Sequence, residues 1–292
     1  MKILVLGING LLGSTIFNVL SSDSQFDVFG SLRLEHYKNF FSQKYSKKIF
    51  HNIDALKFTN ISRLVKKIQP DVVINCIGAI KHKEIGNDPE YAIELNSLLP
   101  LKLSKLCLKK NSRLIHISTD CVFLGSKGMY SENDIPDAID IYGKSKALGE
   151  LCSGDHLVLR MSIIGHELNT SYSLLNWFLS QDNDCLGYKK AIFSGLPTII
   201  IAEIIINYVL KYPNLVGLYN IAAEPINKFD LLSLISKVYG KNIDIIEDKK
   251  IVIDRSLDYT KFSNATGYKS LKWEYLIKKI FMYEKNKKVI HV

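Results

Sequence analysis

Short runs of aliphatic residues alternate with longer amphipathic stretches through residues 1–160 of the chain. Runs that are apolar on both faces are typical of strands buried in a parallel sheet, and amphipathic stretches between them are typical of helices that cover the sheet. The predicted strands span residues 3–6, 26–31, 47–51, 69–76, 113–118 and 156–160. This alternation predicts an α/β protein with a Rossmann-type, doubly wound parallel sheet.

The pattern becomes less regular after residue 160. Helical spacing recurs in residues 173–179, 199–210, 229–238 and 273–281. Residues 217–222 predict one more strand, which we expect to return to the sheet, and residues 243–246 predict another. We therefore expect a smaller, mixed α/β C-terminal domain beside the sheet.

A glycine-rich loop directly follows the first predicted strand. Gly7, Gly10 and Gly13 stand at GxxGxxG spacing, and a helical stretch begins at Ser14. Such glycines permit a tight turn, a close approach of the backbone to a pyrophosphate, and close packing of helix on strand. The N-terminal end of the helix also favours the negative charge of a phosphate. The loop predicts a dinucleotide site, and a plain tight turn is the alternative.

Because the glycine loop lies in the first predicted domain, we expect that domain to bind the cofactor and the other to bind the substrate. Residues 1–160, together with about 196–225, would form the NAD(P)-binding Rossmann domain. Residues from about 161 to 195, together with 226–292, would form the substrate-binding domain. Because open parallel sheets bind ligands beyond the carboxyl ends of their strands, residues at those ends are the candidates for the site.

The end of the second predicted strand bears on the choice of cofactor. An NAD site usually has Asp or Glu there to hold the ribose 2′-hydroxyl. Here the strand ends with Gly30 and Ser31, and Arg33 follows just beyond. An arginine suits a 2′-phosphate, so we expect NADPH. If Arg33 is only a surface residue at a strand end, NADH is also possible.

The next strand ends supply further candidate contacts for the cofactor. Asp54 and Ala55 follow the third strand, where an adenine would rest; Asp54 would accept its amino group or would be an ordinary turn residue. Gly78 follows the fourth strand and leaves room for a cofactor beside the backbone. A helix around residues 91–95 leads to Asn96, which completes this group.

Tyr142 and Lys146 are four residues apart on a predicted helix and therefore share one face. A phenol titrates near ~10, and a neighbouring cation favours phenolate and lowers that pKa toward the working pH. Such a pair can give a proton to the alkoxide that forms as hydride reaches a carbonyl carbon. The same spacing also arises by chance in many helices, so two further motifs are needed to support it.

One of these motifs is the glycine loop, and the other lies at the end of the fifth predicted strand. Ser118, Thr119 and Asp120 stand there, at the edge where parallel sheets bind ligands. Thr119 could orient a substrate carbonyl, or it could only cap the strand. His116 lies inside the same strand, and we interpret it as a core histidine.

Composition indicates a globular protein with a basic surface. The chain has 292 residues, of which 47% are hydrophobic, and a formal net charge of +9. The lysines are dispersed, which is typical of solvated faces; such a surface could attract an anionic substrate, whereas no basic stripe with interleaved aromatics favours nucleic acid.

The cysteines and the apolar segments indicate the compartment. Five cysteines lie far apart without CxxC spacing, which argues against a zinc site or a disulfide framework and favours a reducing compartment. No metal-ligand cluster of recognisable spacing is present. The longest apolar stretch, 198–210, is interrupted by Glu203 and Asn207 and is too short to span a bilayer. With no signal peptide expected at the start, we predict a cytoplasmic protein without a membrane partner.

Taken together, these motifs resemble the extended short-chain dehydrogenase/reductases, and in particular the dTDP-4-dehydrorhamnose reductase-like sugar-nucleotide reductases. The resemblance rests on the glycine loop, Ser-Thr-Asp-Cys-Val-Phe at 118–123, Tyr-Gly-Lys-Ser-Lys at 142–146, Leu159-Arg160, Gly-Leu-Pro-Thr at 195–198 and Asp-Arg-Ser-Leu-Asp at 254–258. It covers nearly the whole chain in order.

The resemblance implies an NADPH-dependent reductase of a nucleotide-activated 4-keto-6-deoxy sugar that serves surface polysaccharide precursor synthesis. It implies that Tyr142 protonates the sugar alkoxide, that Lys146 lowers the tyrosine pKa and holds the nicotinamide ribose, and that Thr119 binds the substrate carbonyl. It also implies cofactor contacts at Gly10, Leu11, Leu12, Cys76, Ile77 and Gly78.

The chain departs from these reductases where the sugar would lie. Residues 161–165 lack the aromatic residue that usually follows the sixth-strand arginine, and the fourth strand is followed by Lys81 and His82. These departures leave the identity of the sugar open. We expect Lys81, His82, Asp120 and Arg255 to contact substrate hydroxyls or its diphosphate, although each would also be ordinary as a surface residue.

Two other kinds of function remain open from the sequence, namely a sibling enzyme of the same fold and a non-catalytic subunit. An epimerase of the same fold would keep its cofactor and consume no NADPH, and a dehydratase would need a further acid beside Asp120. A non-catalytic subunit like the β subunit of methionine adenosyltransferase is the other alternative, which the intact Thr119, Tyr142 and Lys146 argue against. The partner that we expect is a nucleotide sugar, and a homodimer with a second copy of the chain stays open.

Overall fold

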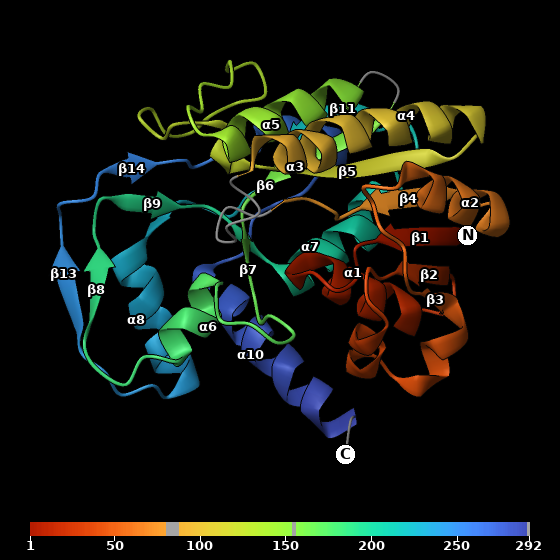
Figure 1. The fold of residues 1–292 in the computed structure, drawn as a ribbon. Helices are drawn as coiled ribbons and strands as arrows, with labels where there is room; N and C mark the ends of the chain where they lie inside the picture. The colour runs from red at the N-terminus through yellow and green to blue at the C-terminus, as the bar shows by residue number, and fades with distance from the viewer. Residues whose placement is uncertain (80–87, 154–155, 291–292) are drawn as a thin grey trace.

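The computed structural model of the protein describes residues 1–79, 88–153 and 156–290 (Figure 1). At its centre lies a seven-stranded sheet in the order β11-β6-β5-β4-β1-β2-β3, with every neighbouring pair parallel. Its strands are β1 (Lys2–Leu6), β2 (Asp27–Ser31), β3 (Ile49–Phe50), β4 (Val72–Asn75), β5 (Arg113–Thr119), β6 (Leu157–Met161) and β11 (Gly217–Asn220). The predicted fold class and the return of residues 217–222 to the sheet are confirmed.

Helices cover both faces of this sheet, as a doubly wound sheet requires. In β1, Ile3 and Val5 belong to one hydrophobic cluster and Leu4 and Leu6 to another, because successive side chains of a strand point to opposite faces. The first cluster includes α1 (Leu11–Ser22), α7 (Thr198–Ile204), α8 (Lys228–Tyr239) and α10 (Trp273–Ile290); the second includes α2 (Phe58–Ile68) and α4 (Leu99–Lys109).

The short strands of the second half form small sheets beside the main one. They are β12 (Ile226–Asn227), β9 (Ala191–Phe193) and β14 (Ile253–Asp254) in one sheet, β8 (Cys185–Tyr188) with β13 (Ile245–Asp248), and β7 (Ile163–Ile164) with β10 (Leu196–Pro197). The sheets that contain β8, β9, β13 and β14 lie on the left of Figure 1. α6 (Leu174–Leu179) also lies in this part, whereas α9 (Thr260–Thr266) packs against β11 of the main sheet. The proposed bounds of a substrate domain remain a prediction.

Some elements are shorter or more irregular than the pattern predicts. The third strand covers only Ile49–Phe50, and 3₁₀ turns occupy Glu35–Phe40 and Gln43–Lys48 before it. The helix predicted over 199–210 is α7 followed by a π-helical turn at Ile205–Val209. A similar π-helical turn at Glu94–Leu98 joins α3 (Pro89–Ile93) to α4. Within the described ranges, no helix combines the length and the apolar character needed to cross a membrane.

A buried ion pair joins the middle of the sheet to α5 (Ile141–Gly149). Glu150 follows α5, and its carboxylate accepts hydrogen bonds from Arg160 Nε at 2.9 Å and Nη2 at 2.6 Å. Ser118 Oγ donates to the same carboxylate at 2.6 Å. Arg160 is 1% exposed and its guanidinium lies 4.8 Å from the Phe123 ring centroid. The pair therefore fixes the end of α5 relative to β5 and β6.

Removing this carboxylate tests that conclusion. We expect Glu150→Ala to lower the free energy of unfolding by about 3–5 kcal/mol, because it leaves a buried guanidinium without its counter-ion. Glu247→Ala, which removes an exposed pair with Lys249, should cost only about 0–1 kcal/mol. Urea denaturation followed by circular dichroism measures both, and equal losses would show that the buried pair has no special role.

Candidate active site

Each of the three glycines after β1 serves the turn in a different way. Gly7 has a φ of 79°, a left-handed conformation that glycine adopts without strain. A Cβ on Gly13 would stand 2.3 Å from the Gly7 carbonyl oxygen, so only glycine allows this contact between loop and helix. Gly10 precedes α1, and its amide donates to Gly7 O at 3.1 Å. The loop thus turns tightly and directs the N-terminal end of α1 outward.

A cleft of about 500 Å³ opens beside this loop. Nine of the predicted cofactor residues line it: Gly7, Gly10, Leu11, Arg33, Asp54, Ala55, Cys76, Ile77 and Gly78. Leu12 and Gly13 lie buried in α1 behind the loop. The opposite wall was not predicted and consists of Ile163, Glu167, Leu168, Asn169, Thr170, Tyr172, Ser173 and Leu174. Residues 167–172 follow β7 without a periodic pattern, so the sequence contains no signal for them, whereas Ser173 and Leu174 begin the helical stretch predicted at 173–179.

The residues at the end of β2 face the same cleft. Ser31 is buried, and its hydroxyl accepts a hydrogen bond from the Gly7 amide at 3.2 Å. Arg33 is exposed and lines the cleft together with Tyr37. Asp54 also lines the cleft, while its side chain accepts the Leu56 amide at 3.2 Å, as a turn aspartate does. Arg33 is therefore placed where a bound phosphate could reach it.

Asn96 does not line the cleft, but its side chain connects the segment after β4 to α5. It is fully buried, accepts a hydrogen bond from Ala79 N at 2.9 Å and donates to Ser145 Oγ at 3.0 Å. A Cβ on Gly78 would stand 3.0 Å from Asn96 Oδ1 and 4.0 Å from Lys146 Nζ. Gly78 thus lines the cleft and also borders Lys146. The hydrogen bonds of Asn96 fix the position of this segment relative to α5.

The side chain of Lys146 is buried, and its ammonium group is hydrogen-bonded to β5. It is 6% exposed and donates to the Ile117 carbonyl oxygen at 2.6 Å. Burial lowers its pKa to about 8, while the nearby Glu150 carboxylate and the Cys152 and Cys76 thiols oppose this shift. The group is therefore charged at neutral pH and loses its charge under mildly alkaline conditions.

Thr119 lies beside Tyr142, and its hydroxyl lowers the pKa of the phenol. The Thr119 hydroxyl also contacts Asp120 Oδ1 at 3.1 Å and accepts from Cys121 N at 3.1 Å. The three predicted catalytic side chains thus come together at the carboxyl end of β5.

One expectation about this group differs from the structure. The pKa of Tyr142 is raised, first by burial and then by Cys121, and the Thr119 hydroxyl opposes this only in part. The Lys146 ammonium donates its hydrogen bond to the Ile117 carbonyl oxygen, and desolvation is the largest influence on the pKa of the phenol. The phenol therefore stays protonated at neutral pH, which is the form that a proton donor needs.

Basic groups lie next to this cluster. Arg255 Nε donates to the Phe123 carbonyl at 2.7 Å, and its Nη1 lies 3.9 Å from Cys121 Sγ. Burial raises the pKa of the Asp120 carboxyl, while Thr119 and Arg255 lower it. Lys228, which the sequence analysis did not identify, interacts electrostatically with Asp120. Lys81 and His82 lie outside the described residues.

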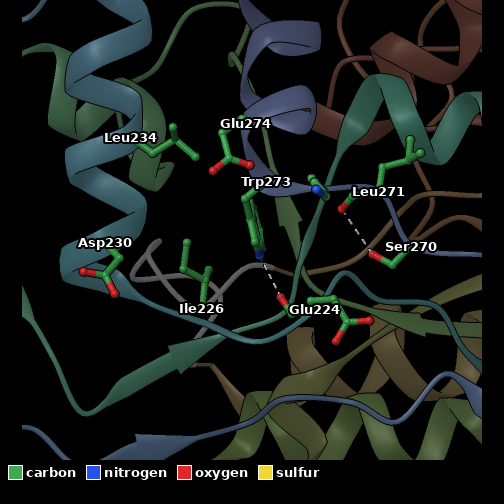
Figure 2. Close-up of a pocket in the computed structure, with 9 residues that line it drawn as sticks. Glu224, Ile226, Asp230, Leu234, Ser270, Leu271, Trp273 and Glu274 are labelled. Atoms are coloured by element: carbon green, nitrogen blue, oxygen red, sulfur yellow. Dashed lines mark hydrogen bonds between the residues drawn. The ribbon is translucent and has the colours of Figure 1, made fainter.

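A second hollow, of about 410 Å³, lies between the first turns of α8 and α10 (Figure 2). Trp273 closes one side of it, and the indole donates to the Glu224 carbonyl at 2.7 Å. The predicted site residues that the structure describes all lie elsewhere. In the described part of the chain, no group of three or more His, Cys, Asp or Glu could hold a metal ion.

Comparison with known proteins identifies the family. The model of the RmlD substrate binding domain family matches residues 1–237. The chain belongs to this family. The match includes the glycine loop, Thr119, Tyr142 and Lys146, so the resemblance drawn from the motifs is confirmed.

Relatives of this RmlD-family chain include proteins of different kinds. A dTDP-4-dehydrorhamnose reductase from Aggregatibacter actinomycetemcomitans is 25% identical over 97% of this chain and 99% of its own length. The methionine adenosyltransferase 2 subunit beta of Bos taurus is 28% identical, but over 51% of this chain and 41% of its own length. A structure of dTDP-4-dehydrorhamnose reductase from Bacillus anthracis in complex with NADP has a TM-score of 0.78 at 18% identity, with 97% and 99% of the two chains covered, which shows a shared fold.

The burial of Lys146 has a measurable consequence. We expect its ammonium to titrate with a midpoint near pH 8, clearly below the ~10.4 of a free lysine side chain, because the buried site disfavours charge. NMR of ¹³C-labelled lysine follows this titration, and Lys146→Met assigns the signal by removing it. Lys144→Met, a change at an exposed position of the same helix, should leave the midpoint unchanged. A spectrum in which every lysine titrates near its free value would contradict the burial of Lys146.

Proposed function

We propose that this protein is an NADPH-dependent reductase of a nucleotide-activated 4-keto-6-deoxy sugar, serving the synthesis of surface polysaccharide precursors. The observation that carries the proposal is that Thr119, Tyr142 and Lys146 lie together at the carboxyl end of β5, where Lys146 donates to the Ile117 carbonyl and Thr119 lies beside Tyr142. A sugar-nucleotide reductase that matches nearly the full length of the chain supports the same reaction class.

The shape of the cleft fits a dinucleotide. Gly10 and the backbone amides of Leu11 and Leu12 would hold the pyrophosphate, because the N-terminal end of α1 faces the cleft there. Asp54 and Ala55 would border the adenine. Cys76, Ile77 and Gly78 would lie along the nicotinamide end, which the contact of Gly78 with Lys146 brings close to the proposed catalytic group. When bound, the nicotinamide supplies the hydride that reaches the sugar carbonyl carbon.

The side chains of the cluster then have separate tasks. Thr119 would donate a hydrogen bond to the sugar carbonyl and orient it. Tyr142 would give its proton to that oxygen as negative charge develops, which leaves a phenolate. Lys146, charged below about pH 8, would stabilise the phenolate and hold ribose hydroxyls. The raised pKa of Tyr142 keeps the donor form populated before reaction.

Turnover of candidate sugars tests this proposal. We expect NADPH absorbance to fall when the protein meets one of a panel of dTDP-, UDP- and GDP-linked 4-keto-6-deoxy sugars. Tyr142→Phe should lower turnover by about 10²–10⁴-fold, because the general acid is lost, and should leave NADPH binding within about threefold. Tyr275→Phe, at an exposed tyrosine of α10, is the control and should turn over normally.

The same assay separates the rival functions. Inversion of a sugar without net consumption of NADPH would indicate an epimerase. A protein that binds NADPH but changes no sugar in the panel would favour a non-catalytic subunit. Normal turnover by the Tyr142→Phe variant would show that another group supplies the proton.

Cofactor choice depends on Arg33 in this proposal. We expect Arg33→Ala to raise the KM for NADPH by about tenfold or more and to leave the KM for NADH nearly unchanged, because only NADPH carries the 2′-phosphate that the guanidinium would bind. Arg63→Ala, at an exposed arginine of α2, provides the matched loss of charge. Steady-state kinetics with both cofactors measure this, and equal effects on the two would exclude a 2′-phosphate contact.

A further inference from the structure

The wall of the cleft that faces the glycine loop is built from the segment between β7 and α6 (Figure 1). We call residues 165–173 of this segment the wall loop. The Ser173 amide donates to the Glu167 carboxylate at 2.9 Å, which closes the loop on itself. The side chain of Asn176 in α6 donates to the Thr170 carbonyl at 3.2 Å and accepts from the Glu167 amide at 3.3 Å. These bonds shape the loop and join it to α6, but they do not fix it relative to the cofactor side of the cleft.

The first two residues of the wall loop contact other elements. A Cβ on Gly165 would stand 2.7 Å from Thr198 Oγ1 and 3.4 Å from Leu11 Cδ1, so the loop begins in close contact with α1 and α7. Leu11 is the first residue of α1 and lines the cleft. The next residue, His166, places Nε2 at 2.8 Å from the Tyr239 hydroxyl, where the two groups share a hydrogen bond. The position of the loop beside the N-terminal end of α1 therefore depends on where His166 is held.

Tyr239 gives His166 a fixed partner. It is the last residue of α8, and its ring meets Phe281 of α10 edge to face, with 5.0 Å between the centroids. α8 and α10 both belong to the large hydrophobic cluster under the main sheet. Burial raises the pKa of Tyr239 and Glu284 raises it further, so the phenol keeps its proton at neutral pH and a hydrogen is available for the bond. The His166–Tyr239 bond thus connects the wall loop to two packed helices.

We propose that His166 and Tyr239 are positioning residues for the cofactor, and that their hydrogen bond holds the wall loop where it closes the cleft around NADPH. Neither residue lines the cleft, so they act through the loop. A wall that is in place before the cofactor arrives lowers the ordering cost of binding, and apparent affinity falls with the fraction of molecules in which the wall is in place. This inference rests on the proposed function only in taking NADPH as the molecule that fills the cleft.

Isothermal titration calorimetry with NADPH tests the bond without any turnover. We expect Tyr239→Phe, which removes one hydroxyl group, to raise the Kd for NADPH by about three- to tenfold, the effect of one hydrogen bond. His166→Leu should raise it by a similar factor. The double variant should bind no more weakly than either single variant, because both changes remove the same bond. His166→Gln, whose side-chain amide can bond to the tyrosine in place of Nε2, should stay within about twofold of the wild type.

A matched variant separates positioning from a general loss of stability. Tyr268→Phe removes a tyrosine hydrogen bond to the Ala222 carbonyl at 3.2 Å, away from the cleft. It should lower the Tm at least as much as Tyr239→Phe does and leave the Kd for NADPH unchanged. Hydrogen exchange followed by mass spectrometry gives a second measurement. In the cofactor-free Tyr239→Phe protein the amides of residues 165–173 should exchange faster than in the wild type, and saturating NADPH should slow them again.

Three results would overturn the proposal. They are wild-type affinity of the Tyr239→Phe protein for NADPH, an equal loss of affinity in Tyr268→Phe, and losses in the double variant that add up, which would mean that the two residues act separately. A wild-type protein that binds NADPH but reduces no sugar would refute the proposed reaction and leave this test intact. A wild-type protein that does not bind NADPH would overturn both, so the two failures are distinguished.

Discussion

The candidate site depends on how closely α5 approaches the buried segment around Asn96. A Cβ on Gly149 would stand 2.1 Å from the Asn96 carbonyl oxygen, so the helix and this segment are in direct backbone contact. Hydrogen bonds from Asn96 to Ser145 and from Ser97 to the Ser145 carbonyl fix the helix further. Because Asn96 also holds the Ala79 amide, one polar side chain aligns α5 with the wall of the cleft. The relative position of Lys146 and Gly78 follows from this contact.

Burial of charge decides the chemistry that the aligned groups can perform. Glu150 pairs with Arg160, and its charge also raises the pKa of Lys146 against the effect of burial. The same low-dielectric surroundings raise the pKa of Tyr142, which favours a protonated phenol. A charged ammonium and a neutral phenol at neutral pH suit proton donation to a developing alkoxide.

Much of the fold could be predicted because parallel strands bury both faces and therefore stand out as aliphatic runs. The runs at 113–118 and 156–160 are close to β5 and β6, and 217–222 contains β11. The weak predictions concern segments whose structure depends on neighbours. β3 pairs over only two residues, and 3₁₀ turns precede it where a longer strand was expected. The cleft wall at 167–172 has no local pattern, because packing against distant elements places it.

The sequence by itself determined the order of strands and helices, the glycine turn and the spacing of Tyr142 and Lys146 along one helix, since these follow from local periodicity and backbone geometry. Only the tertiary structure decided how the side chains ionise and which groups they meet. The ammonium of Lys146 bonds to a carbonyl of β5, and Arg255 bonds to the Phe123 carbonyl although it lies far away in the chain. Burial and long-range contact set these properties, and neither is encoded in the local pattern of residues.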